Sequence, residues 1–148
     1  MLLDVDENIE DPSGFALEKH LEDFLIYNWT STELGKKYDL VTDEGLMVAQ
    51  QYQSDTGPID ILAISKDKTQ YLVIELKKGK TSDVVVGQIL RYMGFVKREL
   101  ATSGESVQGV VIALDDDLKL RNALSMVPSV GFFRYQIEFK LHDVKELN

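Results

Sequence analysis

Apolar residues recur at helical spacing in three stretches of the chain. The first runs from residue 14 to about residue 29, the second from residue 82 to about residue 100, and the third from residue 115 to residue 127, where Pro128 ends it. Residues three and four positions apart lie on one face of a helix. Each stretch therefore predicts an amphipathic helix.

Shorter apolar runs between these helices predict β-strands. Two strand-like runs within residues 40–52 flank an Asp-Glu-Gly turn at residues 43–45, and residues 54–58 then break the chain. The runs at residues 59–64 and 71–77 are separated by a short polar turn. Because this spacing is typical of paired neighbouring strands, the two runs predict a β-hairpin.

The C-terminal half of the chain predicts two further strands. Residues 107–114 (VQGVVIAL) form a continuous apolar run, which is typical of a strand buried on both faces. Residues 132–144 alternate between apolar and polar side chains and predict a final strand. The order α-β-β-β-α-β-α-β predicts an α/β fold with a mixed central sheet flanked by helices. We expect one domain at residues 14–148, after an acidic lead-in at residues 1–13.

Composition excludes several kinds of site. The chain has 148 residues, no cysteine and two histidines, which excludes disulfides, iron–sulfur clusters and thiolate zinc sites. No apolar run approaches the roughly 18 residues expected of a membrane span. The acidic start also lacks the layout of a signal peptide. The sequence therefore predicts a cytoplasmic protein without a membrane partner.

Net charge argues against a nucleic-acid partner, but the distribution of cations argues for one. The chain carries 16 Lys and Arg residues against 25 Asp and Glu residues, a net charge of −9 that repels a polyanion. Cations are nevertheless concentrated in residues 77–98, where Asp83 is the only acidic residue. This basic strip predicts contacts with a phosphate backbone, although a solvated helix face is the alternative. The residues expected to bind nucleic acid are Lys78, Lys80, Arg91, Lys97 and Arg98.

Two carboxylates stand out because they lie in apolar strands. Asp60 occurs within GPIDILA, and Glu75 occurs within YLVIELKK. Since side chains alternate between the two faces of a strand, Glu75 and Lys77 share a face. If the hairpin places Asp60 beside them, two carboxylates and one ammonium converge. Such a site suits a hard divalent cation and the hydrolysis of a phosphodiester.

A salt bridge at the edge of a strand explains the same residues. Glu-x-Lys triplets are common in a charged chain, and a second one occurs at residues 138–140 without a comparable acidic partner. The spacing of the first triplet therefore leaves both interpretations open.

A longer motif contains these residues. It consists of Asp60, then Glu75-Leu76-Lys77, then Gln88 and Tyr92 one turn apart on the second predicted helix. This set resembles the PD-(D/E)xK nuclease superfamily and is most similar to the catalytic domain of NucS-type endonucleases, over residues 14–113. The resemblance implies a restriction-endonuclease-like α-β-β-β-α-β core. It also implies hydrolysis of DNA, with RNA left open as a substrate.

The resemblance implies a role for each residue of the motif. Asp60 and Glu75 would bind Mg²⁺ or Mn²⁺, with the backbone carbonyl of Leu76 as a further ligand. Lys77 would be the catalytic lysine. The residues expected to complete the catalytic site from the second helix are Gln88 and Tyr92.

The family also places a glutamate of the first helix beside the metal and among the catalytic residues. Glu18, which precedes Leu21, fits this pattern better than Glu22, which is the alternative; a solvated helix face explains either glutamate. Two features depart from the family. Ile59 stands where the superfamily has a proline before the aspartate, and the separate DNA-binding domain of NucS-type enzymes is missing from this chain, which leaves the choice of substrate open.

Together, these observations predict a metal-dependent DNA endonuclease domain in a repair or restriction context. The alternative is an inactive nuclease fold that serves as a binding or regulatory module in a larger nucleic-acid-processing assembly. The strongly negative net charge favours that alternative. Both a homodimer and a subunit of a larger assembly are compatible with the sequence.

Overall fold

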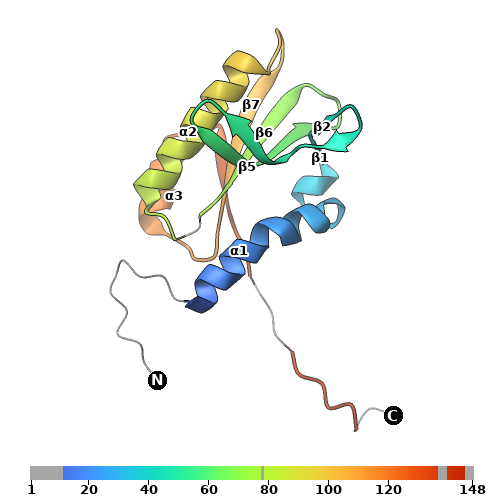
Figure 1. The fold of residues 1–148 in the computed structure, drawn as a ribbon. Helices are drawn as coiled ribbons and strands as arrows, with labels where there is room; N and C mark the ends of the chain where they lie inside the picture. The colour runs from blue at the N-terminus through green and yellow to red at the C-terminus, as the bar shows by residue number, and fades with distance from the viewer. Residues whose placement is uncertain (1–11, 78, 137–139, 146–148) are drawn as a thin grey trace.

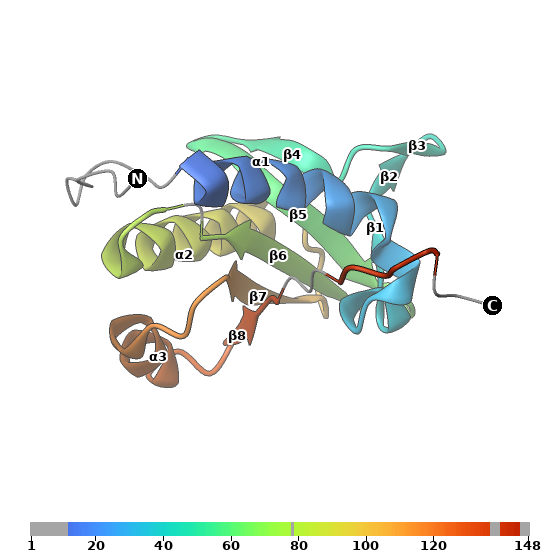
Figure 2. The same cartoon turned by 90° about the horizontal axis from the view of Figure 1, so that it is seen from below.

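A mixed six-stranded sheet separates the helices into two layers (Figure 1 and Figure 2). The computed structural model describes residues 12–77, 79–136 and 140–145, except for the side chains of residues 12–19. The helices are α1 (Pro12–Tyr27), α2 (Ser82–Glu99) and α3 (Leu118–Ser125), with two short 3-10 helices, η1 (Trp29–Ser31) and η2 (Leu34–Lys36). The strands are β1 (Tyr38–Leu40), β2 (Thr42–Asp43), β3 (Leu46–Met47), β4 (Gln50–Ser54), β5 (Gly57–Ser65), β6 (Gln70–Leu76), β7 (Ser106–Ala113) and β8 (Val130–Arg134).

Antiparallel and parallel pairings divide the sheet into two halves. Strand β5 pairs antiparallel with β1, β4 and β6, whereas β6, β7 and β8 pair parallel to one another. Helix α2 connects β6 to β7, and helix α3 connects β7 to β8. The predicted hairpin of β5 and β6 and the mixed sheet are thus present. In the described part of the chain, no helix is both long enough and apolar enough to cross a bilayer.

The apolar core has one layer on each face of the sheet. Leu62 and Val73 pack beneath α2 and α3 on one face. Ile61 and Ile74 lie on the other face, where they pack with Trp29 and the apolar side of α1. Because successive side chains in a strand point to opposite faces, β5 and β6 supply both layers at once.

Residues 38–54 contain more strands than the sequence predicts. Strands β2 and β3 form a small separate hairpin around the expected turn, with Thr42 opposite Met47. Strand β1 precedes this hairpin in the chain and β4 follows it. Both strands pair with β5. The expected break at residues 54–58 is shorter, because the turn occupies residues 55–56 and Gly57 already belongs to β5.

Two helix boundaries also differ from the predictions. Helix α1 begins at Pro12, inside the expected lead-in, and proline suits the first position of a helix because its missing N–H has no partner there. Helix α3 begins at Leu118 rather than at residue 115. Asp117 caps it, since its carboxylate accepts a hydrogen bond from the amide of Leu120.

The final strand is predicted wrongly. Strand β8 spans Val130–Arg134 rather than residues 132–144. It pairs with β7, and the pairing ends where Ala113 lies opposite Arg134, so later residues have no neighbouring strand. Residues 140–145 contain no strand. Residues 137–139, which hold most of the second Glu-x-Lys triplet, lie outside the described residues.

Gly109 on β7 allows close packing of α2 against the sheet. A Cβ atom there would lie 2.7 Å from Met93 Sδ and 3.0 Å from Ile89 Cδ1. We expect Gly109→Ala to lower the free energy of unfolding by on the order of 1 kcal/mol, because the added methyl group overpacks this contact. Urea denaturation followed by circular dichroism measures the change.

Gly94 on the exposed side of α2 provides the matched control. Apart from its chain neighbours and the backbone of its own helix, no atom lies within 4 Å of a Cβ built at this position. Gly94→Ala should raise the free energy of unfolding by up to about 1 kcal/mol, since alanine is the better helix former. A change of the same sign in both variants would contradict the close approach of α2 to β7.

Candidate functional site

Asp60 and Glu75 are buried side by side at the point where β5 and β6 stop pairing. Their exposed fractions are 6% and 1%. The ladder between the two strands ends at the pair Ile61 and Ile74. Beyond it, the amide of Asp60 donates to Glu75 Oε2 (3.2 Å), and the amide of Leu76 donates to Asp60 Oδ2 (2.9 Å). The two carboxylates thus accept hydrogen bonds from backbone amides that lie beyond the paired part of the two strands.

Burial dominates the electrostatics of this pair. Burial, followed by the negative charge of Asp60, raises the pKa of Glu75 to about 9, although the ammonium of Lys80 partly opposes the shift. A buried carboxyl next to a carboxylate ionises only with difficulty. Glu75 therefore keeps its proton at neutral pH unless a cation lies beside it.

Gln51 connects this pair to α1. Its Nε2 donates to Glu22 Oε1 (2.6 Å) and to Asp60 Oδ1 (3.2 Å). The backbone of Gln51 has φ = 53°, in the left-handed region that residues with side chains rarely occupy. Glu22, which is only 6% exposed, is therefore the helix glutamate that the structure brings toward the site. The side chain of Glu18, the preferred candidate, lies outside the described residues.

Helix α2 carries Tyr92 and Gln88, the two residues expected to complete the site from the second helix. Burial, and then the neighbouring carboxyl groups of Glu75 and Asp60, raise the pKa of Tyr92, so its phenol keeps its proton. Gln88 reaches the site through Lys80, because its Oε1 accepts a hydrogen bond from Lys80 Nζ (2.7 Å).

Lys77 does not converge on the two carboxylates as predicted. Its Nζ forms an ion pair with Asp117 Oδ2 at 2.9 Å, and Ser82 Oγ donates to the same oxygen at 2.6 Å. Hydrogen bonds from Ser82 and Lys77 hold the pKa of Asp117 well below its usual range. Lys77 follows the last residue of β6, so strand alternation no longer fixes its direction, and it turns toward the loop between β7 and α3.

The predicted basic strip is partly engaged by other groups of the same chain. Arg98 pairs with Asp55 (2.7 Å), and Lys97 donates to a backbone carbonyl in the loop after α2. Arg91 is exposed. Lys78 lies outside the described residues. The strip therefore offers less uncompensated positive charge than its sequence indicates.

The sequence interpretation missed two residues that the structure places around the site. Asp117 directly precedes the third helix, and an aspartate at that position is a recognised helix cap, so this signal was available. Gln51 has no such signal. Its contact with Asp60 depends on a left-handed backbone that glutamine does not favour.

Asp60 and Glu75 are the described residues best suited to hold a divalent cation. Carboxylate oxygens are the ligands that Mg²⁺ prefers, and Mg²⁺ commonly uses only one or two of them with water and phosphate oxygens. A cation would also remove the repulsion that keeps Glu75 protonated. Among the described residues, no group of three or more His, Asp or Glu side chains is arranged to hold a metal ion. The backbone of Leu76 contacts this pair, since its amide donates a hydrogen bond to Asp60.

Comparison with known proteins identifies the family of this chain. Residues 18–130 match the model of the endonuclease NucS C-terminal domain, and the chain therefore belongs to that family. This finding confirms the resemblance drawn from the sequence motif. A search of curated proteins found no match.

Two solved structures share the fold. The crystal structure of a repair endonuclease from Pyrococcus abyssi has a TM-score of 0.59 and 19% identity, and the match covers 89% of this chain and 50% of that chain. The structure of an EndoMS-dsDNA2 complex has a TM-score of 0.62 and 16% identity, and covers 92% of this chain and 50% of that chain. These matches confirm the expected restriction-endonuclease-like fold. This chain spans about half the length of each.

The raised pKa of Glu75 predicts that stability falls as pH rises. In the unfolded chain this carboxyl ionises near its ordinary pKa of 4.5, whereas in the folded protein it keeps its proton up to about pH 9. Since the folded state binds more protons between these values, the free energy of unfolding decreases across that range. Glu75→Gln should remove this dependence and raise the free energy of unfolding at pH 8 by on the order of 2 kcal/mol.

Urea denaturation between pH 5 and pH 9 in metal-free buffer measures this effect. Glu33→Gln is the control, because Glu33 is exposed on the surface next to η2. It should leave the pH dependence of the parent protein unchanged. An unchanged pH dependence in Glu75→Gln would show that Glu75 is already ionised in the folded state.

Proposed function

We propose that this chain is a metal-dependent nuclease domain that hydrolyses phosphodiester bonds in DNA. The observation that carries the proposal is the buried pair of Asp60 and Glu75 at the open end of β5 and β6, in a member of the NucS C-terminal domain family. The two structural matches are a repair endonuclease and a protein in complex with double-stranded DNA. Duplex DNA is therefore the first substrate to test.

In this proposal, Asp60 and Glu75 hold Mg²⁺ or Mn²⁺, with the Leu76 carbonyl as a further ligand by family resemblance. When bound, the ion supplies polarisation of a phosphoryl oxygen and a lower pKa for the attacking water. Gln51 orients Asp60 through the hydrogen bond to Oδ1, and its second hydrogen bond anchors it to Glu22. Gln51 and Glu22 are accordingly positioning residues.

Tyr92 and Lys77 are the groups of the chain that would act on the phosphate. The protonated phenol of Tyr92 can donate a hydrogen bond to a phosphate oxygen. Lys77 can stabilise negative charge that develops on the phosphorus oxygens. Its ammonium must first leave Asp117, and a phosphate competes with that carboxylate for the same positive charge. Asp117 thus restrains Lys77 in the protein without DNA.

The proposal predicts cleavage that depends on the two buried carboxylates. Purified protein should cleave a fluorescently labelled DNA duplex in the presence of Mn²⁺. Asp60→Asn and Glu75→Gln should each lower the rate by about 100-fold or more, because several kcal/mol of transition-state stabilisation are lost. Calorimetric titration with Mn²⁺ should show binding that both substitutions weaken.

Asp115→Asn is the matched control, since Asp115 is an exposed carboxylate in the loop between β7 and α3. It should cleave and bind Mn²⁺ as the parent protein does. Absence of both cleavage and Mn²⁺ binding in the parent protein would contradict the proposal. Mn²⁺ binding without cleavage would contradict the activity and leave only the metal site.

The restraint of Lys77 gives a separate prediction. Asp117→Asn should raise the cleavage rate at subsaturating DNA by about threefold or more, because Lys77 loses its internal partner. Asparagine still caps α3, so the helix should persist. Lys77→Ala should abolish the gain in the double variant. A lower rate in Asp117→Asn would instead indicate that Asp117 holds Lys77 in its working position.

One observation favours a second candidate function, an inactive binding module. Cations expected to meet DNA are engaged within the chain, Arg98 by Asp55 and Lys77 by Asp117, and the net charge is −9. A module of this kind would bind no Mn²⁺ at Asp60 and Glu75, and the calorimetric titration separates the two candidates.

A further inference from the structure

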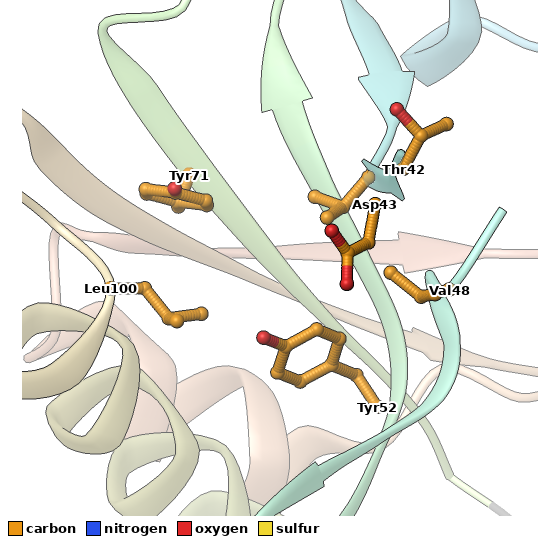
Figure 3. A pocket seen from close by; sticks show the side chains of 7 residues that line it. Thr42, Asp43, Val48, Tyr52, Tyr71 and Leu100 are labelled. Carbon is orange, nitrogen blue, oxygen red and sulfur yellow. The ribbon is translucent and has the colours of Figure 1, made fainter. Parts of the chain in front are cut away.

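A cavity lies away from the carboxylate pair, at the other end of β6. This cavity of about 440 Å³ opens between the β2–β3 hairpin, strands β4 and β6, and the C-terminal end of α2 (Figure 3). Its volume is in the range of small-ligand pockets. The residues that line it are Val41, Thr42, Asp43, Val48, Tyr52, Tyr71 and Leu100.

Three polar groups of this cavity have no partner within the part of the chain that the structure describes. The Asp43 carboxylate and the hydroxyl groups of Tyr52 and Tyr71 form neither hydrogen bonds nor ion pairs with other described residues. Figure 3 shows these side chains around a common space, with Leu100 on the side of α2. Tyr52 and Tyr71 are half-buried and Asp43 is exposed, so all three polar groups remain available to a ligand.

The charge of the cavity favours a cation. Asp43 lines it, and the carboxylate of Glu105 acts electrostatically on Tyr71 at the same end of the sheet. The faces of Tyr52 and Tyr71 carry the negative side of an aromatic quadrupole, which attracts ammonium and guanidinium groups. A phosphate would be repelled by Asp43. The chemistry therefore differs from that expected at the carboxylate pair.

We propose that this cavity binds the guanidinium group of an arginine side chain from a partner polypeptide. Asp43 pairs with the guanidinium through two hydrogen bonds, and a tyrosine ring stacks on its plane. Val41, Val48 and other apolar side chains of the wall pack along the methylene stem of the arginine.

Exposed apolar residues next to Asp43 indicate a polypeptide rather than a small cation. Leu46 lies opposite Asp43 in the hairpin, and Met47 lies opposite Thr42, so each pair shares a face. Leu46 is 72% exposed and Met47 is 45% exposed. A peptide that inserts arginine can cover these side chains with apolar residues that flank it.

This inference does not rest on the nuclease function. Tyr71 lies on the same strand as Glu75 but four residues earlier, or about 13 Å along β6. None of the residues that line the cavity is among those proposed to act on the phosphodiester. Loss of nuclease activity through Asp60→Asn should therefore leave the cavity intact.

A titration followed by ¹⁵N nuclear magnetic resonance tests the proposal. The probe is the peptide acetyl-Leu-Arg-Leu-amide, and its comparison is the same peptide with neutral citrulline in place of arginine. The arginine peptide should shift the amide signals of Asp43, Tyr52 and Tyr71. Asp43→Asn should weaken its binding by about fivefold or more, because a charge-assisted hydrogen bond is lost. Asp115→Asn, the matched exposed carboxylate, should bind as the parent protein does.

Three results would overturn the inference. The citrulline peptide could bind as tightly as the arginine peptide, or Asp43→Asn could bind the arginine peptide as the parent protein does. A single-stranded oligodeoxynucleotide could also shift the same amide signals more strongly than the peptide, which would identify the cavity as a nucleobase site. Binding of the arginine peptide that weakens as sodium chloride is raised would support the ionic contact with Asp43.

Discussion

Asp60 and Glu75 repel each other in a place where water cannot screen them. Two negative charges at short range are costly in a medium of low dielectric constant, and the exposed fractions of these residues are 6% and 1%. Without a cation, Glu75 therefore holds a proton. The amide of Leu76 and the side chain of Gln51 donate hydrogen bonds to Asp60 and hold its carboxylate in place. The requirement for positive charge between the pair is the constraint from which the proposed chemistry follows.

The architecture of the sheet explains why side chains from so many elements meet at this point. Pairing between β5 and β6 stops just before the carboxylates, and α1 and α2 pack on opposite faces of the sheet. Helix α1 contributes Glu22 and helix α2 contributes Tyr92, whereas Asp117 in the loop before α3 holds Lys77 in a separate ion pair.

Elements with strong periodicity were predictable because their pattern is local. The three helices and the β5–β6 hairpin follow from residues that recur on one face or alternate between two. Asp60 and Glu75 were recognisable because a carboxylate inside an apolar strand is unusual. The final strand was not predictable in the same way. Alternation continues to residue 144, but a strand also needs a neighbour, and β7 ends at Ala113.

The sequence by itself determined the faces of the helices, the hairpin that carries the two carboxylates, and the motif that relates the chain to its family. Only the tertiary structure decided that Gln51 forms hydrogen bonds with both Glu22 and Asp60, and that Asp117 forms an ion pair with Lys77. The Gln51–Glu22 and Lys77–Asp117 contacts join residues 29 and 40 positions apart in the chain. Local periodicity specifies which way a side chain faces within its own element. It does not specify which distant element packs against that side chain, because this depends on how all the apolar faces are buried together.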